Sequence, residues 1–140
     1  MSHFVFPVRV YYEDTDAGGV VYHANYLKFM ERARTEWLRG KGFEQDALRE
    51  EQGLIFVVRS VEVTYRQPAY FNEMLDVSVE ISKIGPRTIV FEQNIIRPEQ
   101  ADRLAERLVQ GKVVVVCIDQ KKLSSIPIPE FIKKEMTECR

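Results

Sequence analysis

The spacing of apolar residues changes near residue 54, and this change limits the folds that the chain can adopt. Before it, Tyr26, Met30, Ala33 and Trp37 recur at helical spacing, which places them on one face of a helix. From Leu54 onward, apolar and polar residues alternate, as in "LDVSVEIS" and "RTIVFEQNIIR". Such alternation is typical of strands with one buried face. The chain therefore predicts one amphipathic helix followed by several strands.

The other segments complete this order of elements. The run "FVFPVRVYY" (residues 4–12) is rich in β-branched and aromatic residues and predicts a first strand, with Pro7 favouring an edge strand or an early position in the strand. "VVRSVEVTYR" and "LVQGKVVVVCID" predict two further strands, and "KIGPR" predicts a hairpin turn. Asn25 or a neighbour is expected to cap the helix, and Gly40 and Gly42 are expected to end it. "EQDALREEQG" and "IPIPEFIKKEM" predict short helical pieces.

These elements predict the α+β class, with an antiparallel meander of five strands wrapped around one long helix. The 140 residues are expected to form a single domain, residues 1–140. One helix cannot cover a five-stranded sheet, and an edge strand remains unpaired. We therefore expect a homo-oligomer, either a dimer or a dimer of dimers.

Composition narrows the classes of partner. The net charge of −1 gives no electrostatic reason to expect a nucleic acid. No apolar run is long enough to span a membrane, and the first residues do not form a secretory signal. Cys117 and Cys139 fit neither a disulfide framework nor a metal site, and His3 and His23 are twenty residues apart. We expect a cytoplasmic protein without metal or other cofactor.

The stretch "DTDAGGVVYHANYL" (residues 14–27) gathers acids, glycines and a histidine where the first strand meets the helix. It begins like a calcium loop but has Gly18 and Asn25 at the fifth and twelfth positions, where oxygen ligands and a bidentate glutamate are required. Motifs for a serine nucleophile or a P-loop are absent from the sequence. One interpretation is a plain connection, in which Asp14 and Asp16 form turns and His23 is incidental.

The other interpretation is a catalytic loop. A helix start offers unpaired N–H groups and a partial positive charge. Gly18 and Gly19 would let a substrate approach the backbone closely. An aspartate nearby can act as a base or a nucleophile on a polarised carbonyl. This set suits thioester hydrolysis. The leaving group is a thiolate, whose parent thiol has a pKa of about 8.5, so it departs without strong acid catalysis.

The segment "VRVYYEDTDAGGVVYHANYLKFMERARTEWL" (residues 8–38) resembles the signature of the 4-hydroxybenzoyl-CoA thioesterase family. Within that family it is most similar to the YbgC-type branch, the acyl-CoA thioesterases associated with the Tol–Pal envelope system. The likeness continues through "FVVRSVEVTYRQPA" and the last strand, so it covers nearly the whole chain. It implies the hotdog fold, an antiparallel five-stranded sheet curled around one long helix.

The resemblance also implies roles for particular residues. Asp16 would be the catalytic carboxylate, as nucleophile or general base. His23 matches the histidine of the branch and would orient water, substrate or the aspartate, while a backbone N–H beside it polarises the thioester carbonyl. Tyr12 would line the substrate pocket, and Gly19 and Tyr22 are expected to bind substrate. The substrate implied is an acyl-CoA, split into free acid and CoA.

Two alternatives remain open at this point. A hotdog dehydratase would use a similar acid and histidine but would release no thiol. A non-catalytic protein that binds acyl thioesters or acyl carrier protein would tolerate Asp16→Asn. The resemblance further suggests acyl carrier protein as a partner, and peripheral association with the membrane.

Overall fold

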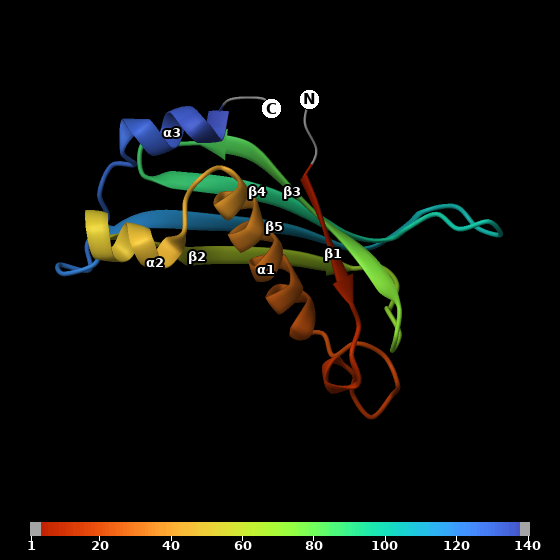
Figure 1. The fold of residues 1–140 in the computed structure, drawn as a ribbon. Coiled ribbons are helices and arrows are strands. Elements are labelled where there is room, and N and C mark those ends of the chain that lie inside the picture. The colour runs from red at the N-terminus through yellow and green to blue at the C-terminus, as the bar shows by residue number, and fades with distance from the viewer. Residues whose placement is uncertain (1–3, 138–140) are drawn as a thin grey trace.

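One face of a five-stranded antiparallel sheet lies against a single long helix, α1 (Asn25–Gly40), in the computed structural model (Figure 1). The structure describes residues 4–137, so His3 and Cys139 lie outside the described residues. The strands are β1 (Phe4–Arg9), β2 (Leu54–Tyr65), β3 (Met74–Ile84), β4 (Thr88–Arg97) and β5 (Glu106–Asp119). Shorter pieces are a 3₁₀ turn (Tyr12–Asp14), α2 (Gln45–Ala47), a π-helical turn (Leu48–Gln52) and α3 (Glu130–Thr137). The predicted fold class is confirmed.

The strand order differs from the predicted meander. It is β1-β3-β4-β5-β2, so only β3, β4 and β5 follow one another as neighbours. The segment between β2 and β3 first runs along β5, where Arg66 and Gln67 donate to the carbonyl of Leu108. It then reaches β1, where Val10 donates to the carbonyl of Glu73. This connection is long enough to cross the sheet, and it places β2 and β3 on opposite sides of the β4–β5 pair.

The core lies between α1 and the inner face of the sheet. The four residues predicted to form the apolar helix face are all buried: Tyr26, Met30, Ala33 and Trp37. The Trp37 ring packs edge-on against Phe91 of β4, with 5.6 Å between centroids. At Gly111 of β5, an added Cβ would lie 2.7 Å from Cε of Met30. A glycine there allows the helix to approach the sheet closely.

Most predicted element ends are confirmed. α1 ends at Gly40, and Gly42 has a positive φ of 96°, a conformation that glycine adopts without strain. β3 and β4 form the hairpin predicted at "KIGPR", with Ile84 opposite Ile89. Pro7 lies in the edge strand β1, as predicted.

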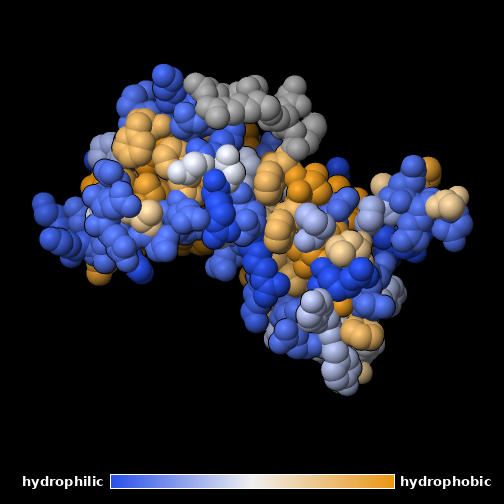
Figure 2. All heavy atoms as spheres, viewed as in Figure 1, coloured by the Kyte–Doolittle hydropathy of each residue, from blue (hydrophilic) through white to orange (hydrophobic). Residues whose placement is uncertain are grey.

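The surface in the view of Figure 2 is mixed. Hydrophobic residues reach it beside β1, whereas the projecting loop between β4 and β5 is mainly hydrophilic. Among residues 4–137, no helix is both long and apolar enough to cross a membrane.

A polar residue joins the helix to the middle of the sheet. Gln93 of β4 has no exposed surface, and its Nε2 donates to the carbonyl of Met30 at 3.1 Å. Its Oε1 accepts a hydrogen bond from Nη1 of Arg34 at 2.8 Å. The amide therefore satisfies polar groups on α1 that the sheet would otherwise bury, which makes it a specific contact between the two layers.

Replacing Gln93 with methionine should keep the side-chain volume and remove both hydrogen bonds to α1. Arg34 would lose its acceptor, so we expect the free energy of unfolding to fall by about 1–3 kcal/mol. Urea denaturation measures the change, with Gln120→Met as control because Gln120 is exposed. Equal stability of the two variants would show that the Gln93 contacts do not hold the layers together.

Candidate active site

A buried carboxylate shapes the loop between β1 and α1. Asp14 is only 6% exposed, and its Oδ2 accepts the N–H of Tyr11 at 2.8 Å. Its Oδ1 accepts from Nδ2 of Asn25 at 2.9 Å, and its carbonyl accepts the N–H of Tyr22 at 2.8 Å. Asp14 is therefore a turn-forming residue that ties the loop to the first turn of α1. The helix was predicted to be capped by Asn25 or a neighbour. The N-cap residue is the neighbour Ala24, without a side-chain cap, and Asn25 is the first helical residue, with its side chain held by Asp14.

Asp16 lies in the same loop, but its side chain is exposed. Its Oδ1 accepts the N–H of Gly18 at 2.8 Å, whereas Oδ2 accepts no hydrogen bond from residues 4–137. The loop closes through the N–H of Asp16 to the carbonyl of Val20, at 2.9 Å. Gly19 has a φ of 82°, and a Cβ at Gly18 would lie 3.2 Å from Asp16 Oδ1. The glycines thus let the loop fix one carboxylate oxygen and leave the other open.

The start of α1 leaves backbone donors open. The N-cap residue is Ala24, and no side chain caps the helix. Asn25 donates to the carbonyl of Tyr22 at 2.8 Å, and Leu27 donates to that of Ala24 at 3.2 Å. The N–H groups of His23 and Ala24 have no acceptor within residues 4–137. Two donors at the positive end of a helix are therefore available to an oxygen atom of a ligand.

The His23 side chain is exposed beside these donors, and its ring lies 4.6 Å from that of Tyr22. It borders an open surface pocket of about 270 Å³, whose other lining residues are Val21, Tyr26, Tyr65, Arg66, Gln67 and Pro68. The hydroxyl of Tyr65 donates to the carbonyl of His23 at 3.0 Å. Sequence reasoning missed Tyr65, because alternation in β2 places it on a face but does not show its distance from the loop.

The structure brings the predicted site residues onto one loop without joining all of them. Asp16 and His23 form no hydrogen bond with each other. Tyr12 is 80% exposed, and its ring packs edge-on against Phe71; neither residue lines the pocket that His23 borders. In a single chain these residues therefore line an open surface. The catalytic and substrate-binding roles stay predictions.

A buried arginine supports the site from behind. Arg97 is 6% exposed and donates to Oε1 of Glu73 at 2.9 Å and to the carbonyl of Pro68 at 3.0 Å. The hydrogen bonding from Arg97 to the Glu73 carboxylate holds the pKa of Glu73 below its usual value. Within the segment that Arg97 fixes, the carbonyl of Ala69 accepts the N–H of Val21 at 2.9 Å. A sequence signal existed, since Arg97 falls on the buried face of the β4 alternation.

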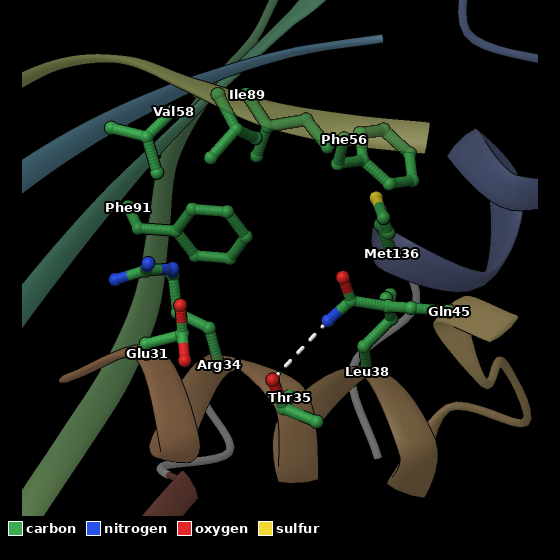
Figure 3. Close-up of a pocket in the computed structure, with 11 residues that line it drawn as sticks. Glu31, Arg34, Thr35, Leu38, Gln45, Phe56, Val58, Ile89, Phe91 and Met136 are labelled. Atoms are coloured by element: carbon green, nitrogen blue, oxygen red, sulfur yellow. Dashed lines mark hydrogen bonds between the residues drawn. The ribbon is translucent and has the colours of Figure 1, made fainter. Parts of the chain in front are cut away.

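A second cavity, of about 100 Å³, lies between α1 and the sheet (Figure 3). Phe56, Phe91 and Met136 face into it, and a hydrogen bond of 3.2 Å from Gln45 to Thr35 crosses one side. None of the site residues predicted from sequence lines this cavity. Among residues 4–137, no group of three His, Cys, Asp or Glu side chains is placed to hold a metal ion.

Comparison with known proteins identifies the family of the chain. A sequence profile described as the thioesterase-like superfamily matches residues 10–136. The acyl-CoA thioesterase YbgC of Haemophilus influenzae is 47% identical over 130 residues, which cover 93% of this chain and 91% of that protein. The acyl-CoA thioester hydrolase YbgC of Escherichia coli is 45% identical over 135 residues, 96% of each chain.

Solved structures share the fold. A probable thioesterase from Bartonella henselae superposes with a TM-score of 0.83 at 36% identity, covering 91% of this chain and all of that one. A 4-hydroxybenzoyl-CoA thioesterase variant bound to 4-hydroxybenzoyl-CoA gives a TM-score of 0.89 at 15% identity, covering 96% and 99%. At that low identity the second likeness concerns the fold alone. The chain therefore belongs to the thioesterase-like superfamily and, within it, to the group of YbgC-type acyl-CoA thioesterases.

Proposed function

We propose that the protein is an acyl-CoA thioesterase, which hydrolyses an acyl-CoA to the free acid and CoA. This proposal rests on two kinds of group in the same loop: a carboxylate with one oxygen held by a hydrogen bond and the other open, and backbone N–H groups at the start of α1 that have no acceptor. Asp16 keeps one oxygen open, and the N–H groups of His23 and Ala24 lack acceptors within residues 4–137. A carboxylate and oxyanion donors are sufficient for a thioester, whose thiolate leaves readily.

In the proposed reaction, the thioester oxygen accepts hydrogen bonds from the open helix-start amides. This interaction strengthens as negative charge develops on the oxygen in the transition state. In the first route, Asp16 Oδ2 attacks the carbonyl carbon, the C–S bond breaks, and CoA leaves as the thiolate and gains a proton. Water then hydrolyses the mixed anhydride to release the acid and restore the carboxylate.

In the second route, Asp16 removes a proton from a water molecule that attacks the carbonyl carbon directly. The C–S bond breaks, and the proton passes to the departing thiolate. His23, exposed beside the amides, would orient the water or the substrate in either route. Gly19 and Tyr22 would contact the substrate, and Tyr12 would line the pocket of the assembled enzyme.

We also propose that the protein forms a homodimer through β2. β2 is an edge strand of twelve residues with four exposed large apolar side chains: Val57, Val58, Val61 and Tyr65. The opposite edge, β1, has six residues and contains Pro7, which has no N–H to offer another strand. A second copy paired along β2 would extend the sheet and close the open surface beside Tyr65.

The finer parts of the proposal depend on the family resemblance. They are a cytoplasmic location with peripheral membrane association, a link to the Tol–Pal system, acyl carrier protein as a partner, and a dimer of dimers.

The release of free thiol during turnover distinguishes the thioesterase from the two alternative functions. A dehydratase releases no thiol from an acyl-CoA, and a binding protein keeps its function without the Asp16 carboxylate.

We expect Asp16→Asn to lower kcat for thiol release at least about a hundredfold, because the catalytic carboxylate is lost. The amide can still accept the N–H of Gly18, so the loop should keep its shape. Thiol release is measured with acetyl-, butyryl-, octanoyl-, palmitoyl- and 4-hydroxybenzoyl-CoA. Asp119→Asn is the matched control, since Asp119 Oδ1 also accepts an N–H two residues ahead, that of Lys121. Wild-type activity in Asp16→Asn would refute the proposed function.

Single turnover in H₂¹⁸O tests for the first route. Label in the Asp16 carboxylate shows that this carboxylate formed an anhydride, which water opened at the aspartyl carbon. Label in the released acid alone results from the base route or from an anhydride that water opened at the acyl carbon. Mass spectrometry of the peptide that contains Asp16 reads the first outcome.

Val61→Lys should convert the dimer to a monomer, because a charge on an edge strand opposes pairing with a second strand. Light scattering coupled to size exclusion measures the mass. Val5→Lys is the control on the other edge strand, where Val5 is 44% exposed against 40% for Val61. Dissociation by Val5→Lys but not by Val61→Lys would place the interface on β1 instead.

A further inference from the structure

The carbonyl of His23 lies just before α1, whose N-cap residue is Ala24. The first carbonyl that a helix uses is that of its N-cap residue. Leu27 donates to the carbonyl of Ala24, at 3.2 Å. The carbonyl of His23 therefore receives no backbone donor from residues 4–137.

A side chain from a distant strand supplies a donor to the His23 carbonyl. Tyr65 is the last residue of β2, and its hydroxyl donates to the His23 carbonyl at 3.0 Å. Its ring is held by aromatic contacts, 5.7 Å from the Tyr26 ring and 6.3 Å from the His23 ring between centroids. The hydroxyl is thus directed at one carbonyl by packing on two sides.

That carbonyl shares a peptide group with one of the open donors. The C=O of His23 and the N–H of Ala24 are opposite ends of one planar, resonance-stabilised unit. Fixing the oxygen therefore fixes the direction of the N–H bond. A hydrogen bond received at the oxygen also draws electron density from the nitrogen, which makes the N–H a stronger donor.

We propose that Tyr65 is a positioning residue for the thioester oxygen, acting through the His23–Ala24 peptide group. It orients and polarises the Ala24 N–H, which has no acceptor within residues 4–137. Tyr65 itself need not touch the reacting atoms. The inference rests on the proposed function, because the Ala24 N–H matters only if an oxygen develops charge in front of it.

Tyr65→Phe removes the hydroxyl and keeps the aromatic contacts. If polarisation supplies about 10–30% of a donor effect worth about 10²–10³ in rate, kcat should fall about two- to eightfold. KM should change little, since the oxygen gains most of its charge in the transition state. Tyr70→Phe is the control, because Tyr70 is 49% exposed against 47% for Tyr65, and its hydroxyl has no hydrogen bond within residues 4–137.

Amide NMR tests the contact without substrate. In Tyr65→Phe the Ala24 amide proton and nitrogen resonances should move upfield relative to wild type, as expected when the carbonyl of the preceding residue loses a hydrogen bond. Since the ring and its aromatic contacts are kept, the contribution of the ring current should change little. Tyr70→Phe should leave the Ala24 resonances in place.

The outcomes separate the inference from the function. Unchanged Ala24 resonances or an unchanged kcat in Tyr65→Phe would overturn the inference, while thiol release and its loss in Asp16→Asn would still support the function. A raised KM with a lowered melting temperature would assign Tyr65 a structural role and likewise overturn it. Absence of thiol release from the wild-type protein on the five acyl-CoAs would refute the function, and the positioning role with it.

Discussion

The site depends on how α1 begins. The N-cap residue Ala24 provides no side-chain cap, and the N–H groups of His23 and Ala24, just before the helix, find no acceptor within residues 4–137. Open donors at a helix start are costly when buried, and they attract an anion when they face a site. The loop before the helix keeps them open, because Asp14 uses its carboxylate on Tyr11 and Asn25 instead of on the helix-start amides.

The two neighbouring aspartates have different roles, because one is buried and the other is exposed. Asp14 is buried and its two oxygens are both used, so it shapes the loop. Asp16 is exposed and has one oxygen held by Gly18, so it can present the other to a substrate. Behind them, Arg97 fixes the segment at Pro68 and Glu73 on which the loop rests. Polar contacts on the buried side of the sheet thus hold the exposed loop in position.

Sequence reasoning reached the elements and the chemical candidates because both leave local signals. Helical spacing at Tyr26 and Met30 predicted the buried face, and the glycines of residues 18 and 19 marked the loop. The position of β2 left no such signal, because alternation determines the face of a side chain and not the neighbour of its strand. The predicted meander was wrong for this reason. Tyr65 was missed for the same reason, since its partner His23 is 42 residues away in the chain.

The sequence also contained a signal for the contacts between layers, in the form of polar residues on the buried face of β4. Gln93 and Arg97 fall on the same side of β4 as Ile89, Phe91 and Ile95. A polar group at a core position needs partners there, and these two residues join β4 to α1 and to the segment behind the loop.

In the proposed reaction the amides of His23 and Ala24 receive the thioester oxygen, with the carbonyl carbon facing Asp16. A crystal structure of Asp16→Asn with an intact acyl-CoA measures this directly. We expect the carbonyl oxygen within about 2.7–3.1 Å of one of those nitrogens, with the carbonyl carbon facing the side chain at position 16. A thioester bound in the cavity beneath α1, or with its oxygen turned away from both amides, would contradict it.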